Sequence, residues 1–387
     1  MATFFLVIIY LAFISLGLPD SLLGSAWPIM HLQLDAPLSF AGIVSMIVSG
    51  GTIVSSLSSG FLLSRFGTGK VTFVSVLMTA AALLGFSFAG SFLWLCLLAI
   101  PLGLGAGAVD SGLNSFVAAH YKAKHMSWLH CFWGIGATCG PIIMSAWIAR
   151  DGQWRNGYLT VSIVQFVLVA ILLFTLPMWR RFERPSGIDT ENDVSIGRTT
   201  GAKASMFPVL FSFFCYCSIE TTTGIWGASY LVSLRGVDAS VAAGWISMFY
   251  LGITLGRLLS GFVTMKLSGP RLIRLGQVAC AIGVLILMLP LPSESAVAGL
   301  LFIGFGLAPI FPGMLHETPA RFDAARSQKI MGFQMASAYV GSTFTPPIFG
   351  FLAGRMSMGL LPYLQISLLC VMVICCEITN RQMRRTS

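Results

Sequence analysis

Apolar residues along this chain form continuous runs of about twenty, the length that an α-helix needs to cross a bilayer. Membrane-barrel strands instead alternate apolar and polar residues over about ten positions. The pattern therefore predicts an all-α integral membrane protein, with short connections between its helices. The twelve predicted transmembrane helices cover residues 4–30, 40–63, 71–89, 92–119, 126–149, 157–178, 207–233, 239–265, 271–290, 295–319, 330–354 and 360–378.

The chain contains an internal repeat. The matches at a shift of 201 positions (260 minus 59) are Ser59-Gly60-Phe61 with Ser260-Gly261-Phe262, and Gly103-x-Gly105 with Gly304-x-Gly306. The matches at a shift of 205 positions (341 minus 136) are Gly136 with Gly341, Thr138 with Thr343, Pro141 with Pro346 and Arg150 with Arg355. Equivalent helices follow in the same order and orientation, which predicts two six-helix halves related by an axis along the membrane normal.

The repeat predicts the domain organisation. Residues 1–179 are expected to form an N-terminal six-helix bundle, and residues 207–387 a C-terminal bundle with a short basic tail. Residues 180–206 mix acidic, basic and small side chains, a composition typical of a flexible linker. We expect this linker to lie in the cytoplasm.

Two parallel six-helix halves joined by a cytoplasmic loop resemble the major facilitator superfamily, over nearly the whole chain. The segment Gly60-Phe-Leu-Leu-Ser64-Arg65-Phe-Gly67 resembles the signature loop between helices 2 and 3 of that superfamily. Ser64 stands where the family has Asp, so we assign no charge relay to this loop. Arg65 and Gly67 are predicted to serve a tight cytoplasmic turn with a basic anchor.

Charge fixes the expected topology. Only 10 % of the residues are charged and 56 % are hydrophobic, with a mean hydropathy of +0.84. The formal net charge is +9, and 18 of the 23 Lys and Arg residues fall in the even-numbered connections and the C-terminal tail. By the positive-inside rule both termini are cytoplasmic, in a cell (inner) membrane. The basic excess is thus a topology signal and not a nucleic-acid surface.

The sequence gives no indication of an enzyme. The nine cysteines lie within apolar segments without paired ligand spacing, so no metal site is predicted. The stretch Gly67-Thr-Gly-Lys70-Val lacks the spacing of a phosphate-binding loop, and no cofactor is expected. Transport energy would then come from an ion gradient or from the gradient of the solute itself.

Three acids inside predicted helices are the candidates for proton coupling: Asp20, Asp110 and Glu220. An ionisable group in hydrocarbon costs at least about 2.5 kcal/mol, so it needs a partner or a function. Pro19 and Gly24 loosen the helix around Asp20, as in the interrupted helices that line transporter sites. Asp110 and Asn114 are four apart and share a helix face.

The residues predicted to contact a solute and to face one water-accessible cavity are Asn114, His130, Trp133, Trp226, Tyr230 and Gln334. Aromatic rings offer an apolar platform with a polar edge to the C–H face of a sugar. An interfacial aromatic belt is the alternative for Trp226 and Tyr230. Arg257 and Glu317 are gating residues or members of structural ion pairs between helices.

Several of these segments together resemble the fucose permease branch of sugar:proton symporters. They are Pro19-Asp20-Ser-Leu-Leu, Asp110 with Asn114, and the run Trp128-Leu-His130-Cys-Phe-Trp133-Gly-Ile-Gly136 that ends at Gly140-Pro141. The resemblance implies proton-coupled uptake of a hexose or deoxyhexose. Asp110 replaces the Glu of that branch, and His130 replaces an amide.

Other functions remain open at this point. The motif Gly136-x-x-x-Gly140-Pro141 resembles one in helix 5 of proton-coupled exporters, although the same spacing is a common packing device. A transport-dead sensor is expected to carry a folded cytoplasmic domain or long tails. The favoured hypothesis is a monomeric secondary transporter that works by alternating access, with a midplane site between helices 1, 4, 5, 7, 10 and 11.

Overall fold

The computed structural model describes residues 2–121, 123–182, 205–263, 267–322 and 324–386, and every regular element in these ranges is helical. The linker predicted at 180–206 falls largely outside them. The elements are α1 (Ala2–Asp20), α2 (Leu22–Gln33), η1 (Leu38–Phe40), α3 (Ala41–Phe66), α4 (Thr68–Ser87), α5 (Phe92–His120), α6 (Ala123–Ile148), α7 (Trp154–Phe182), α8 (Met206–Arg235), α9 (Ala239–Val263), α10 (Gly269–Met288), α11 (Ser295–Leu307), α12 (Ile310–His316), α13 (Thr318–Arg321), α14 (Ala324–Arg355) and α15 (Leu360–Thr386).

Ten spans within the described residues are long and apolar enough to cross a membrane. Three of them join two consecutive elements: α1 with α2, η1 with α3, and α11 with α12. The long helices α8 and α14 do not reach the same apolar character, and together with the ten they complete the predicted set of twelve. Both carry polar side chains toward the centre of the bundle, as described below, which accounts for their lower hydropathy.

The first membrane span is broken where the sequence predicts. Helix α1 ends at Asp20, Ser21 interrupts the helix, and α2 begins at Leu22. Pro19 lies within the last turn of α1, where its ring removes one backbone donor and crowds the preceding turn. The break places the Asp20 carboxylate beside irregular backbone near the middle of the span.

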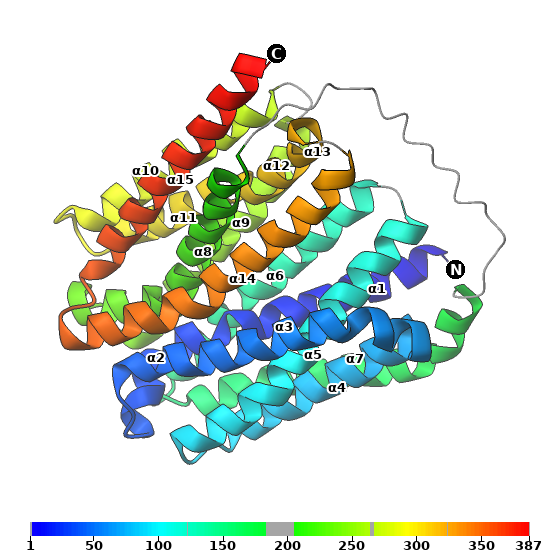
Figure 1. Cartoon of the computed structure of the whole chain (residues 1–387). Coiled ribbons are helices and arrows are strands. Elements are labelled where there is room, and N and C mark those ends of the chain that lie inside the picture. The colour runs from blue at the N-terminus through cyan, green and yellow to red at the C-terminus, as the bar shows by residue number, and fades with distance from the viewer. Residues whose placement is uncertain (1, 122, 183–204, 264–266, 323, 387) are drawn as a thin grey trace.

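The helix pairing confirms the parallel repeat. Helix α1 packs on α6 as α8 packs on α14, α3 on α5 as α9 on α11, and α4 on α7 as α10 on α15 (Figure 1). Individual close approaches also recur. A methyl group on Gly103 would collide with the Val48 carbonyl, and one on Gly304 with the Phe249 carbonyl, and both pairs are related by the shift of 201 (304 minus 103; 249 minus 48).

The motif at Gly136 and Gly140 proves to be a packing device within the first half. Both glycines lie against α1 and the α1–α2 break, Gly136 at the Ile14 carbonyl and Gly140 at Leu18 and Ser21. Pro141 follows inside α6. Two residues before Gly136, α6 also contacts the second half, because Gly134 packs against the Thr254 side chain of α9.

The turn between α3 and α4 agrees with the predicted tight connection. Gly67 has a φ of +80°, a conformation that favours glycine, and it alone separates the two helices. Arg65 is exposed, with its guanidinium near the Phe61 and Phe66 rings.

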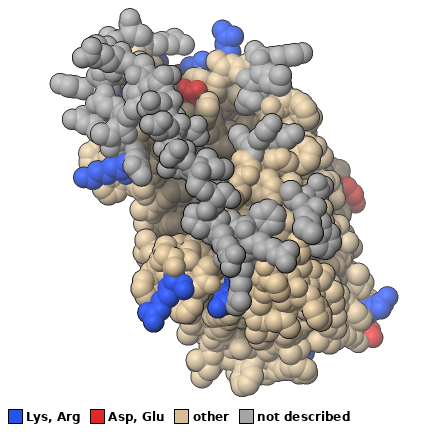
Figure 2. Space-filling model, turned by 90° about the vertical axis from the view of Figure 1, so that its right-hand side faces the viewer, with Lys and Arg blue, Asp and Glu red and all other residues tan. Residues whose placement is uncertain are grey.

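Figure 2 shows only scattered charged side chains among uncharged ones on the visible face.

The two halves are in close contact at the end of the bundle that carries η1. Gly24 of α2 packs against the Gly224 carbonyl of α8, and Gly42 of α3 against Pro347 of α14, with no room for a methyl group. Toward the termini α3 and α14 diverge (Figure 1). The distribution of Lys and Arg predicts that this end is the non-cytoplasmic one.

Asp238, in the connection before α9, caps that helix by accepting a hydrogen bond of 2.8 Å from the Ser240 backbone N–H. The Ser240 hydroxyl and N–H lower the pKa of Asp238. Its stabilising contribution is therefore present above the pKa of the unfolded chain and is lost as pH falls through the folded value. Asp238→Ala should cost about 1 kcal/mol, and the loss should shrink in acid. Thermal unfolding at several pH values measures this, with Asp238→Asn as the uncharged cap; a pH-independent loss would contradict the charge contribution.

Candidate functional site

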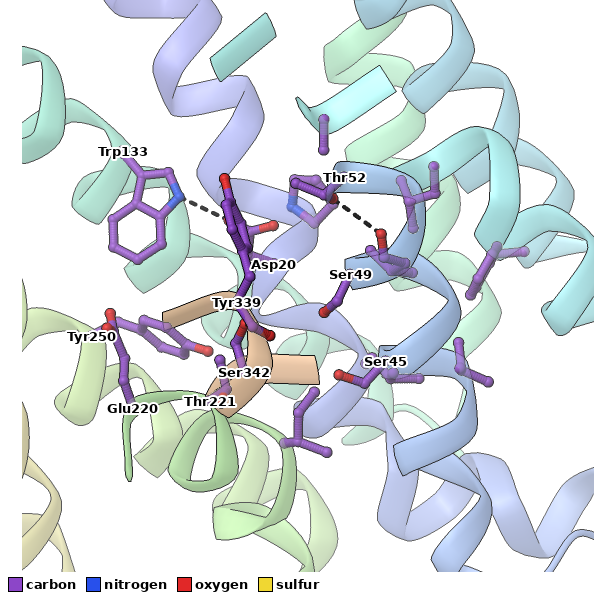
Figure 3. Close-up of a pocket in the computed structure, with 18 of the residues that line it drawn as sticks. Asp20, Ser45, Ser49, Thr52, Trp133, Glu220, Thr221, Tyr250, Tyr339 and Ser342 are labelled. Atoms are coloured by element: carbon purple, nitrogen blue, oxygen red, sulfur yellow. Dashed lines mark hydrogen bonds between the residues drawn. The ribbon is translucent and has the colours of Figure 1, made fainter. Parts of the chain in front are cut away.

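A cavity of about 270 Å³ lies near the middle of the bundle, between the two halves. Helices of the first half contribute residues of α1, α2, α3, α4, α5, α6 and α7, and the second half contributes residues of α8, α9 and α14. Its polar lining consists of Asp20, Ser45, Ser49, Thr52, Trp133, Tyr158, Glu220, Thr221, Tyr250, Tyr339 and Ser342, and Figure 3 labels all of these except Tyr158. At this position both halves of the chain can contact a bound solute.

Asp20 is exposed to this cavity although it lies inside the bundle. Its Oδ2 accepts a hydrogen bond of 2.8 Å from the indole Nε1 of Trp133, which reaches across from α6 (Figure 3). The helix break after Asp20 orients the carboxylate toward the cavity. Asp20 and Trp133 are thus brought together as a carboxylate beside an aromatic face, an arrangement that the sequence analysis predicted only as separate candidates.

Glu220 of α8 also lines the cavity, and its partner is Arg257 of α9, with 3.7 Å between Oε1 and Nη2. Each of these side chains is 18 % exposed. The Arg257 guanidinium lies 5.0 Å from the centre of the Trp133 ring. The structure therefore pairs Arg257 with a candidate proton-coupling acid. Glu317, its companion in the gating hypothesis, instead lies 3.9 Å from Arg321 at the cytoplasmic end.

Asp110 and Asn114 form the pair that their spacing predicts. The Asn114 amide donates a hydrogen bond of 2.9 Å to the Asp110 carboxylate, and its own oxygen is buried without a hydrogen-bond partner among the described residues. Neither residue lines the cavity. Both are partly buried on α5, so a role for Asp110 in proton coupling, or for Asn114 in solute contact, stays a prediction.

The structure corrects the predicted cavity lining for three residues. Trp226 is fully buried and donates to the Pro346 carbonyl at 2.9 Å, and the buried Tyr230 hydroxyl donates to the Leu287 carbonyl at 2.6 Å. The buried Gln334 amide exchanges hydrogen bonds with Thr318. Their polar atoms are satisfied inside the second half, so they need no water. Burial also excludes the aromatic-belt alternative for Trp226 and Tyr230.

His130 lies close to the cavity without lining it. Its ring stands edge-on to Phe13 of α1 at 5.9 Å. Of the six residues predicted to contact the solute, Trp133 alone belongs to the lining that the described part of the chain provides.

The sequence analysis missed a row of hydroxyls. Ser45, Ser49 and Thr52 follow one another at four and three residues on α3, which places them on one helix face. Thr52 donates to backbone carbonyls at Val48 and Gly103, while the row as a whole faces the cavity (Figure 3). The signal was available in the sequence as the spacing of these three hydroxyl residues on one face of α3. Tyr250 and Tyr339, on the facing helices, had no comparable signal.

Comparison with known proteins gives a family match. The model of the Major Facilitator Superfamily matches residues 9–316 of this chain. The chain is 24 % identical over 314 residues to the glucose/mannose transporter GlcP of Bacillus subtilis, covering 78 % of this chain and 77 % of that protein. It is 22 % identical over 342 residues to the cis,cis-muconate transport protein of Acinetobacter baylyi, covering 83 % and 80 %.

Solved structures show the same fold. The nucleoside transporter NupG (D323A mutant) superposes with a TM-score of 0.75 at 13 % identity, covering 97 % of this chain and 98 % of that one. A D-xylose-proton symporter superposes with a TM-score of 0.73 at 15 % identity, covering 97 % and 96 %. At these identities the likeness concerns the fold alone.

Proposed function

The chain belongs to the Major Facilitator Superfamily, and from this premise we propose that it takes up a sugar or a similar small polar solute together with protons. As a secondary transporter it needs a site that opens to one side of the membrane at a time. The cavity between the halves is the observation that carries the proposal. Both halves of one chain contribute to its lining, and we propose that the single chain is the functional unit.

The size and polarity of the cavity favour a small, hydroxyl-rich solute. Its volume of about 270 Å³ falls below the roughly 300–1,000 Å³ typical of sites for drug-sized ligands. Hydroxyls of α3 face hydroxyls of α8, α9 and α14, with the Trp133 ring beside them. Hydroxyls both donate and accept hydrogen bonds, and an indole supports the apolar face of a sugar ring.

The charges at the cavity disfavour an anionic solute. Asp20 and Glu220 are the charged side chains of the described lining, and both are acidic. The nearby cation, Arg257, is already engaged by Glu220 and by the Trp133 ring. An anionic solute would have to displace one of these partners.

The relatives named above transport different classes of solute, so they support the sugar proposal only in part. Similarity to a glucose/mannose transporter agrees with a sugar, and the finer assignment to the fucose permease branch remains part of this proposal. Similarity to a muconate transport protein leaves an anionic solute as the competing outcome. Export by proton antiport is the alternative from the sequence, and the packing of Gly136 and Gly140 on α1 agrees with the packing interpretation of its motif.

Uptake by proteoliposomes under an imposed inward proton gradient tests the proposal. We expect accumulation of at least one of D-glucose, D-xylose and L-fucose, and stabilisation of the purified protein by the same sugar in thermal unfolding. Protein-free liposomes and vesicles without the gradient are the controls. Accumulation of cis,cis-muconate with none of the sugars, or stabilisation by lipophilic cations alone, would overturn the sugar assignment.

A further inference from the structure

Four side chains form a continuous chain of contacts from one half of the bundle to the other. Asp20 of α1 accepts the Trp133 indole N–H at 2.8 Å. The face of the same indole lies 5.0 Å from the Arg257 guanidinium of α9. Arg257 in turn lies 3.7 Å from Glu220 of α8. Trp133 is therefore the residue through which an acid of the first half contacts a charged pair of the second.

The Asp20–Trp133 link depends on the charge of Asp20. A hydrogen bond to an ionised carboxylate is roughly twice as strong as one between neutral groups. When Asp20 binds a proton, the indole N–H keeps only the weaker carbonyl acceptor of the neutral acid. Other acids near Asp20 are Asp110 of α5 and Glu220 of α8.

The position of the Trp133 indole influences where the Arg257 guanidinium lies, because the guanidinium is attracted to the face of the ring. Arginine stays protonated, so its attraction to the indole face does not depend on pH. At 3.7 Å the ion pair with Glu220 is longer than a charge-assisted hydrogen bond, which is about 2.7–2.9 Å. Arg257 is thus shared between the ring and the carboxylate. Also beside it are Tyr216 of α8, and His130 and Cys131 of α6.

The chain of contacts lies on the seam where α6 and α9 join the halves. Gly134, next to Trp133, packs against Thr254, and Ser145 packs against Gly244 further along. Tyr250 of α9 meets the Trp133 ring edge-on, with 6.4 Å between ring centres. Small residues keep these two helices in contact over a long distance, and Trp133 is the large side chain inserted at the cavity.

We propose that Trp133 is a latch that transmits the protonation state of Asp20 to the Arg257–Glu220 pair, and so couples proton binding in the first half to movement of the second. With Asp20 ionised, the indole is held and Arg257 is drawn onto its face. Protonation of Asp20 weakens its hold on the indole, so that Arg257 closes on Glu220 and α8 and α9 separate from α6. The latch rests on the proposed proton-coupled transport and names the residue that performs the coupling.

A distance measurement that needs no solute tests the latch. Spin labels go on Gly90→Cys and Glu294→Cys, one in each half, after replacement of the nine native cysteines; Gly90 has open space and Glu294 is exposed. Double electron–electron resonance in lipid nanodiscs compares the distance between the labels at acidic and at mildly alkaline pH. The otherwise native protein should show a shift of the distance distribution with pH.

The key variant is Trp133→Phe, which keeps a ring for Arg257 and removes the N–H donor. We expect it to lose the pH-dependent shift. Trp147→Phe is the matched control. Trp147 also lies on α6, outside the cavity, and its indole donates a hydrogen bond to Thr160 of α7, so this variant loses an indole hydrogen bond but should keep the shift. Arg257→Gln breaks the second link and should also lose the shift, which keeps the test decisive if Trp133→Phe fails to fold.

Retention of the native shift in Trp133→Phe, or no shift in the native protein, overturns the latch. These outcomes are separable from failure of the proposed function, because the labels report without any solute. If native proteoliposomes accumulate a sugar while Trp133→Phe shifts normally, the transporter assignment stands and the latch falls. If no sugar is accumulated but the shift is lost in Trp133→Phe, the latch stands and the solute assignment falls.

Discussion

Asp20→Asn is expected to abolish uphill accumulation driven by a pH gradient while leaving counterflow exchange of the solute. An amide has the shape of a protonated carboxyl group but cannot release a proton, so the cycle loses its coupling and keeps its neutral, loaded form. Accumulation should fall to the level set by the gradient of the solute itself. Proteoliposome uptake with an imposed pH gradient, and exchange without one, measure the two activities separately.

Asp35→Asn is the matched control for this substitution. Asp35 lies beyond the end of α2 with a φ of 48°, a conformation that Asn tolerates well, and it does not line the cavity. If Asp20→Asn still accumulates solute, Asp110→Asn and Glu220→Gln become the tests of the remaining acids. Unaltered pH-driven transport in all three would require facilitated diffusion or another coupling ion.

Gly304→Ala is expected to prevent formation of a stable second half. Its Cβ would collide with the Phe249 carbonyl, and backbone cannot move aside as a flexible side chain does. Overpacking costs typically about 1–3 kcal/mol, and forcing α9 away from α11 also weakens the van der Waals packing along both helices. We expect a large drop in the thermal unfolding temperature and in the yield of monodisperse protein.

Gly50→Ala is the control, because a Cβ at Gly50 of α3 meets nothing within 4 Å. In an open helical position Ala is favoured over Gly by about 1 kcal/mol, so this variant should be at least as stable as the native protein. Equal stability of the two variants would contradict the prediction, because it would show that α9 and α11 can move apart at Gly304 without loss of stability.

The helices and their repeat could be predicted from the sequence because both depend on local patterns. An apolar run of sufficient length must hydrogen-bond its own backbone in lipid, whatever its neighbours are. The match of Gly103 with Gly304 marked equivalent positions of the two halves, and Pro19 marked the span that breaks after Asp20. The i, i+4 spacing likewise brought Asn114 onto Asp110.

The composition of the cavity was decided by the tertiary structure. A polar residue in a membrane helix must find a partner, but the sequence does not say whether that partner is water or a carbonyl of the next helix. Trp226 and Tyr230 found carbonyls, whereas the hydroxyls of Ser45 and Ser49 face the cavity. Arg257 had several acids available, and the rotation and distance of α8 and α9 selected Glu220. Helix rotation and separation are set by packing of the whole bundle, which no single segment encodes.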